Sequence, residues 1–153
     1  MRFLKTNSGK KGEGMPVVRN QAFYFKEGFC WSNTLNPYAR LLKCRIKSKT
    51  INDVGAMSLT SIIVNILSNE DIVCFLNSNL IFNYYRNFIN NTVNIQINDI
   101  RQIPVKIPDL DERTKLKTLF DKAVQMREIK SLSKQEEYKI QSELDEIITK
   151  VYL

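Results

Sequence analysis

Alternating amide and aliphatic side chains form the stretch of this 153-residue chain that is best suited to chemistry on a ligand. Asn94 and Gln96 are separated by one aliphatic residue and flanked by two more, the alternation typical of a half-buried strand. Both amides are then expected on the same face. Asn and Gln can hydrogen-bond adenine bidentately at N6 and N7 in the major groove, so the pattern suits base recognition. The alternative for either residue is an ordinary solvated strand face.

Basic residues gather upstream of the amides. Residues 1–60 hold 11 Lys/Arg against 3 Asp/Glu, whereas 61–106 hold 3 of each and 107–153 hold 9 against 10. Concentrated positive charge attracts polyanions, above all nucleic acid. A solubilising face, or an edge strand that carries Lys against aggregation, is the alternative. The candidate phosphate contacts are Lys26, Arg40, Lys43, Arg45, Lys47 and Lys49.

Aromatic and hydroxyl side chains stand among these cations. Trp31, Ser32 and Tyr38 are candidates to lie near base edges, because aromatic rings can stack on bases while Arg holds phosphate. Trp31 taken alone fits a position in the core better than a contact.

The residues needed for catalysis are missing from the pattern. The chain has no histidine, which excludes histidine-based general catalysis and histidine-ligated metals. Cys30, Cys44 and Cys74 are widely spaced and are expected to be free, buried or half-buried thiols. None of the five glycines belongs to a G-x-G cofactor loop. We therefore predict no catalysis, metal or cofactor in this chain.

The elements that must position these residues indicate an α+β fold, a small mixed or antiparallel sheet with a buried helix. Strand patterns cover residues 17–46 and 51–66, with helix as an alternative for the second. Ser68 followed by acidic residues predicts a helix start, and residues 68–88 are apolar on much of the helix circumference. Asn77 and Ser78 inside this helix are expected to be structural.

A C-terminal antiparallel helical hairpin follows. Ser133 and Glu136 form a capping-box pattern, so the break near residues 131–132 is short. The faces expected to pack are lined by Leu116, Leu119, Phe120, Ala123, Met126 and Ile129 on the first helix and Ile140, Leu144, Ile147, Ile148 and Val151 on the second.

Three regions are predicted from these patterns. They are a flexible basic leader at 1–14, an α+β domain at 15–108 and the hairpin at 109–153. No apolar run approaches a membrane span, and the first residues lack the apolar core of a secretory signal. A cytoplasmic location is expected.

Four short motifs in order give the chain a family resemblance. They are the aromatic-glycine-tryptophan-serine pattern at 24–32, the Phe-Leu-Asn-Ser run at 75–78, the N-x-Q-x-x-D-I-x-x-I-P pattern at 94–104 and the acidic helix at 143–148. Together they resemble the C-terminal target-recognition region of adenine-specific DNA methyltransferases. The relatives are fused restriction-modification enzymes and BREX-type phage-defence methyltransferases. Residues 36–38 have one proline where that family's catalytic motif has two, and are expected to form a turn.

The resemblance implies a DNA-recognition module that is not catalytic by itself. Its partners would be double-stranded DNA and a methyltransferase catalytic domain or subunit, which would hold S-adenosylmethionine. The alternative is a protein-interaction module in which the hairpin and the apolar helix dock a partner and the basic N-terminus only aids solubility.

Overall fold

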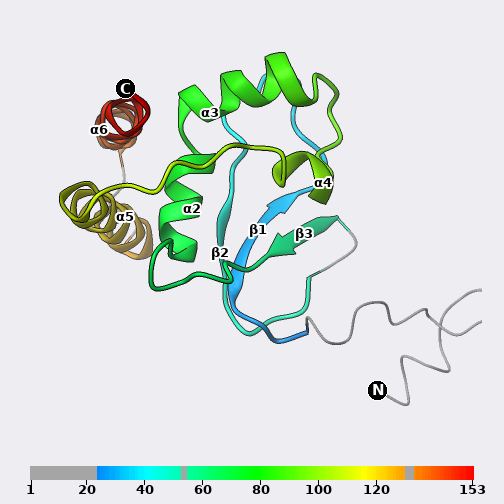
Figure 1. Cartoon of the computed structure of the whole chain (residues 1–153), viewed down its shortest axis with the longest axis horizontal. Coiled ribbons are helices and arrows are strands. Elements are labelled where there is room, and N and C mark those ends of the chain that lie inside the picture. Colours follow the sequence, from blue (N-terminus) through cyan, green and yellow to red (C-terminus); the bar gives the residue numbers. More distant parts are fainter. Residues whose placement is uncertain (1–23, 53–54, 130–132) are drawn as a thin grey trace, which may run out of the picture.

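The protein is an α+β structure with a small antiparallel sheet, a buried helix and a C-terminal helical hairpin, as the sequence predicts (Figure 1). The computed structural model describes residues 24–52, 55–129 and 133–153. The elements are β1 (Gly28–Ser32), β2 (Arg45–Lys47), β3 (Ala56–Leu59), α2 (Asn69–Leu76), α3 (Asn79–Tyr84), the π-helix η2 (Tyr85–Ile89), α4 (Ile97–Ile100), α5 (Leu110–Glu128) and α6 (Lys134–Tyr152).

Strand β1 is the centre of the sheet, which has the order β2-β1-β3 in the described part of the chain. Phe29 and Trp31 belong to one core cluster, whereas Cys30 between them points to the other face. Gly28 is required at the start of β1, because a Cβ there would lie 2.2 Å from the carbonyl oxygen of Leu59. At the end of the strand pattern predicted over 17–46, only Arg45 and Ile46 pair as a strand, in β2.

Helix α2 starts where the sequence predicts, with Ser68 as N-cap. The Ser68 hydroxyl accepts from the Asp71 amide at 3.1 Å, and the Asp71 carboxylate accepts from the Ser68 amide at 2.9 Å. One side of the helix packs with the sheet in the first core cluster. The opposite side packs Cys74 and Phe75 against the hairpin in a second cluster. The helix is therefore buried between two layers.

The predicted single helix over 68–88 is wrong, because the chain breaks after Leu76. The Asn77 side chain accepts from the Cys44 amide and donates to the Cys44 carbonyl, each at 2.8 Å. Ser78 then N-caps α3, and its hydroxyl donates to the carbonyl of Phe75 at 2.8 Å. Both residues have the structural role expected of them, and they turn the chain toward the top of the molecule in Figure 1.

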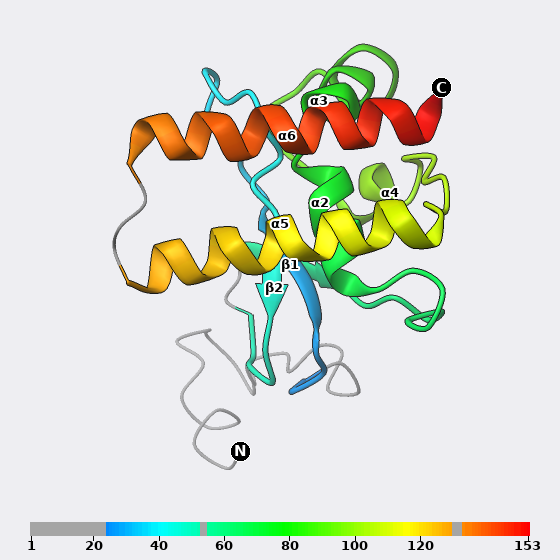
Figure 2. The ribbon, with the colours of Figure 1, turned by 90° about the vertical axis from the view of Figure 1, so that its left-hand side faces the viewer.

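Helices α5 and α6 run antiparallel across α2, which confirms the hairpin (Figure 2). The Ser133–Glu136 capping box is present at the start of α6. Arg113 joins the hairpin to α2 and to the turn before it, since its Nε lies 3.3 Å from the Asp71 carboxylate and its Nη1 donates to the Asn65 carbonyl. Ile129, expected on the packed face, is exposed instead because α5 ends there.

The boundaries of the three predicted regions remain predictions. The leader at 1–14 lies outside the described residues, as do 15–23 at the start of the α+β region and the break at 131–132. Within the described residues, no helix combines the length and apolarity that a membrane crossing requires.

Candidate nucleic-acid interface

A row of cations lies along β2 and the segments on either side of it. Its members are Arg40, Lys43, Arg45 and Lys49, and we call them the cationic strip. All four residues are exposed. Lys43 adopts a left-handed conformation with φ of 55°, at the turn just before β2. Because β2 is an edge of the described sheet, the strip lies at that edge.

Little negative charge opposes the strip locally. Residues 28–52 contain no Asp or Glu. Glu27 lies 3.8 Å from the Lys49 ammonium, but both side chains are exposed, and such a pair contributes little free energy. Lys26 is exposed beside Glu27, and Arg45 donates through Nε to the Cys30 thiol at 3.5 Å. The strip is thus a surface that an anion can approach.

Two of the predicted contacts lie inside the protein. Trp31 is 2% exposed and packs with Phe29 at a ring-centroid distance of 6.1 Å. Lys47 is 5% exposed, and its ammonium donates to the carbonyls of Lys26 at 2.6 Å and Ser48 at 3.4 Å. Neither side chain can reach DNA in this conformation. Their predicted role as contacts is replaced by a structural one.

The strand predicted to carry the amides does not form. Ile95 is fully buried and Val93 is exposed, but α4 begins at Ile97, so the segment is a loop that enters a short helix. The Asp99 carboxylate holds this loop, accepting from the amide of Gln96 at 2.9 Å and from Nδ2 of Asn90 at 2.7 Å. Asn94 and Gln96 therefore lie on a loop that is held by hydrogen bonds, and not on a β-strand.

The loop nevertheless brings several predicted residues to one end of the molecule. Thr34 and Asn94 form an isolated antiparallel bridge, with hydrogen bonds from Leu35 to the Val93 carbonyl and from Ile95 to the Asn33 carbonyl. This bridge sets the exposed Asn94 and Gln96 beside the continuation of β1, near exposed Ser32. We call the chain around it, residues 32–38 and 83–96, the amide end.

Tyr38 extends from the tip of the amide end. It is 91% exposed, and its amide donates to the Asn36 side chain at 2.8 Å. The sequence predicts a turn at residues 36–38, and the structure confirms it. Arg40 and Lys43 follow directly, so the strip begins where the amide end stops.

An exposed aromatic pair on α3 and η2 was not predicted as part of the site. Tyr84 and Phe88 were expected on buried sides of a helix, yet their rings contact each other at the surface, with centroids 5.2 Å apart. Asn83 and Asn87 stand four residues apart on the same helical segment and are exposed. That polar spacing was the signal in the sequence for an exposed face.

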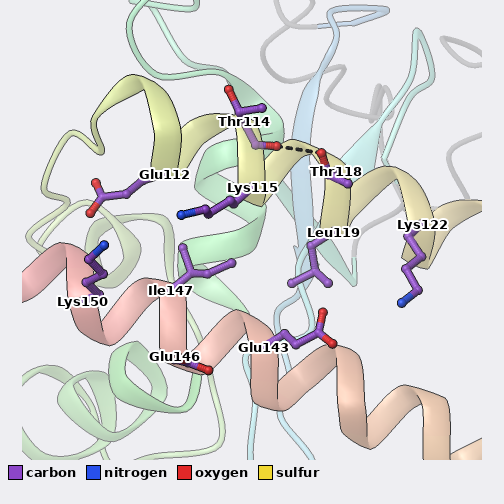
Figure 3. A pocket seen from close by; sticks show the side chains of 10 residues that line it. All are labelled: Glu112, Thr114, Lys115, Thr118, Leu119, Lys122, Glu143, Glu146, Ile147 and Lys150. Atoms are coloured by element: carbon purple, nitrogen blue, oxygen red, sulfur yellow. Dashed lines mark hydrogen bonds between the residues drawn. The ribbon is translucent and has the colours of Figure 1, made fainter.

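A separate groove lies between the two helices of the hairpin (Figure 3). It has a volume of about 540 Å³ and an apolar floor that includes Leu119 and Ile147. Glu112 and Lys150 face each other near one end, and Lys122 lies toward Glu143 near the other. Opposite charges on both rims lower the net potential, so the groove suits a mixed-charge protein surface better than a phosphate.

The cysteines offer no reactive centre. All three thiols are free and buried, in agreement with the expected free, buried or half-buried thiols. Burial raises the pKa of Cys44 above its ordinary range and that of Cys74 to about 12, so both stay neutral thiols at physiological pH. The described residues contain no cluster of three or more side chains able to ligate a metal.

Comparison of the chain with models of protein families, with curated proteins and with solved structures finds no match. Function is therefore inferred from the sequence pattern and from the geometry of the strip and the amide end.

Proposed function

We propose that this chain is a DNA-recognition module of an adenine-specific methyltransferase or restriction-modification enzyme. The cationic strip would hold phosphates, and the amide end would read base edges through Asn94, Gln96, Ser32 and Tyr38. The proposal includes Lys26, which is exposed just before β1, as a further phosphate contact. It leaves out Trp31 and Lys47, which are buried.

The observation that carries the proposal is that the strip follows the amide end directly along the chain. Arg40 and Lys43 follow the exposed Tyr38 turn, and that turn follows the bridge between Thr34 and Asn94. A ligand that lies across this junction meets cations on one side and amides on the other. Phosphate contacts orient a protein on a duplex, and base-edge contacts give sequence preference, so the two kinds of residue are needed side by side.

Catalysis belongs to another polypeptide region in this proposal. A methyltransferase catalytic domain or subunit would hold S-adenosylmethionine and the adenine that is taken out of the stack. The chain described here would supply specificity and bind no cofactor. The whole assembly would work in the cytoplasm.

The strip sets the expected salt dependence of DNA binding. The four phosphate contacts of the strip, counted without Lys26, give a slope of log affinity against log salt of about −3.6 on duplex DNA. Between about 50 mM and about 200 mM salt, this slope corresponds to roughly a 150-fold loss of affinity. A complex held together by apolar contacts would change little over the same range.

The experiment is DNA binding by the double variant Arg40→Glu, Arg45→Glu at these two salt concentrations. The matched control is Lys134→Glu, Lys139→Glu, which makes the same charge change on exposed residues of α6. The proposal expects the first variant to lose most of its affinity and part of its salt slope, while the control stays near wild type. Equal affinities for both variants and the wild type would refute the strip as the DNA contact.

A second function, protein docking, is favoured by one observation in the turn before α2. The turn before α2 exposes Ile62, Ile63, Val64 and Ile66, and Ile62 is 96% exposed. A run of exposed aliphatic residues is unusual on a monomer and is typical of an interaction surface. If the wild-type chain binds no duplex even at low salt, this surface becomes the better guide to function. An Ile62→Asp variant should then lose the partner that the wild-type chain retains.

A further inference from the structure

The exposed pair Tyr84 and Phe88 is a feature that folding does not require. Phe88 is 76% exposed and Tyr84 is 37% exposed, although both are among the larger apolar side chains. Their rings are tilted by 34° and lie 5.2 Å apart between centroids, so they form one continuous aromatic surface. Exposing such a surface forgoes the free energy of burial, which suggests that another molecule covers it.

The backbone beneath the pair is firmly held. Tyr84 ends α3 and Phe88 lies in η2, where the Asn90 amide donates to the Tyr85 carbonyl at 2.9 Å. Within this π-helical turn Tyr85 is fully buried in the core, whereas Tyr84 before it and Phe88 after it are exposed. Short π-helical turns of this kind occur often at functional sites.

The loop that follows fixes the pair within the amide end. Arg86 donates through Nη1 to the Thr92 carbonyl at 2.7 Å, and Asn90 donates through Nδ2 to the Asn94 carbonyl at 2.9 Å. Tyr85 also reaches the Asp99 carboxylate at 3.4 Å. The aromatic surface is thus preorganised, and ordering it on binding costs little entropy.

The chemistry around the pair favours a nucleic acid as the occupant. Residues 72–98 contain no Asp or Glu, one Arg and eight Asn. Asn83, Asn87 and Asn91, which are neighbours of the two aromatic residues in the sequence, are exposed. In both views the segment shares the top of the molecule with the loop of residues 36–43, which leads into the cationic strip (Figures 1 and 2). The Asp145 carboxylate of α6 is engaged by Asn79 at the start of α3, and the Asp99 carboxylate is engaged by Asn90 and Gln96.

We propose that Phe88, supported by Tyr84, stacks on a nucleobase of bound DNA at a base step that opens to admit it. The inference rests on the proposed function, because the strip must first hold the duplex against this end. The asparagines around the ring would hydrogen-bond the edges of the unstacked bases. An aromatic wedge of this kind lowers the cost of distorting the duplex by replacing the stacking that the base loses.

The test measures affinity and base unstacking with the full chain. Duplexes carry 2-aminopurine at successive positions, because the fluorescence of this base rises when it leaves the stack of its neighbours. The variant is Phe88→Ala, the conservative variant is Phe88→Trp, and the control is Tyr138→Ala, which removes a similarly exposed ring from α6.

The expected result is about a ten- to hundred-fold loss of affinity in Phe88→Ala with an unchanged salt slope, since the phosphate contacts remain. The fluorescence increase seen with wild type should disappear in Phe88→Ala and persist in Phe88→Trp and Tyr138→Ala. Wild-type affinity and fluorescence in Phe88→Ala would overturn the stacking contact while leaving the proposed function intact. A loss of affinity without any fluorescence change at any position would also overturn it. Failure of the wild-type chain to bind duplex DNA at low salt would overturn both.

Discussion

Replacing Asn77 by Ala tests whether this side chain holds the two halves of the fold together. Its two hydrogen bonds join the break between α2 and α3 to the backbone of Cys44, 33 residues earlier in the chain. The backbone carbonyl of Asn77 also accepts from Gln141 of α6 at 3.0 Å. Asn77 therefore lies where the sheet layer, the buried helix and the hairpin meet.

The magnitude follows from the groups that lose partners. Each net hydrogen bond contributes about 1 kcal/mol, and the amide and carbonyl of Cys44 are left without their side-chain partner in the variant. We expect Asn77→Ala to lower the free energy of unfolding by about 2–4 kcal/mol, a large fraction of the roughly 5–15 kcal/mol typical of a domain. For a chain of this size the melting temperature should fall by about 5–15 °C.

The assay is urea denaturation followed by circular dichroism, with Asn65→Ala as an exposed control. Asn77→Asp separates the two hydrogen bonds, because a carboxylate can accept from the Cys44 amide but cannot donate to its carbonyl. This variant should be destabilised at neutral pH and should partly recover, relative to wild type at the same pH, when the new carboxyl is protonated in acid. Losses in Asn77→Ala no greater than those in Asn65→Ala would refute the bridging role.

Three further outcomes are expected. Gly28→Ala should destabilise the sheet by about 1–3 kcal/mol or prevent folding, since its Cβ would overlap the Leu59 carbonyl, and wild-type stability in urea would contradict the close approach. Ser133→Ala should cost about 1 kcal/mol in the same assay through loss of the cap of α6, and no change would argue against the capping box. The Cys74 thiol, whose folded pKa is raised from 9.0 to about 12, stabilises the fold fully below pH 9, and this contribution is lost as pH rises toward 12. Between pH 9 and 12 each such thiol lowers the free energy of unfolding by about 1.4 kcal/mol per pH unit. The free energy of unfolding of Cys74→Ala should therefore fall less steeply with pH in this range than that of wild type. Equal slopes for the variant and wild type would contradict the prediction.

Elements with local signals could be predicted from the sequence. The starts of α2 and α6 follow from Ser68 and Ser133, whose partners stand three residues away. The hairpin follows from apolar spacing that continues over five turns in each helix. In these places the residues that determine the structure are neighbours along the chain.

Elements that depend on distant partners could not be predicted. The break at Asn77 is stabilised by Cys44, and the loop at 93–96 is pinned by Asp99 and by the bridge to Thr34, so periodicity alone favoured a longer helix and a strand there. Burial of Lys47 likewise depends on carbonyl groups, one of which lies 21 residues away. For the candidate site, the sequence therefore indicated most of the cations and both amides but not the surfaces that present them.

Binding of the full chain to a mixed-sequence duplex library tests the central claim most directly. Fluorescence anisotropy would be measured at about 50 mM and about 200 mM salt, and the retained DNA would be sequenced. A recognition module predicts binding that weakens by roughly two orders of magnitude at the higher salt, with enrichment of a short motif that contains adenine. Absence of binding at the lower salt, or binding that salt leaves unchanged, would contradict DNA recognition by the strip and the amide end.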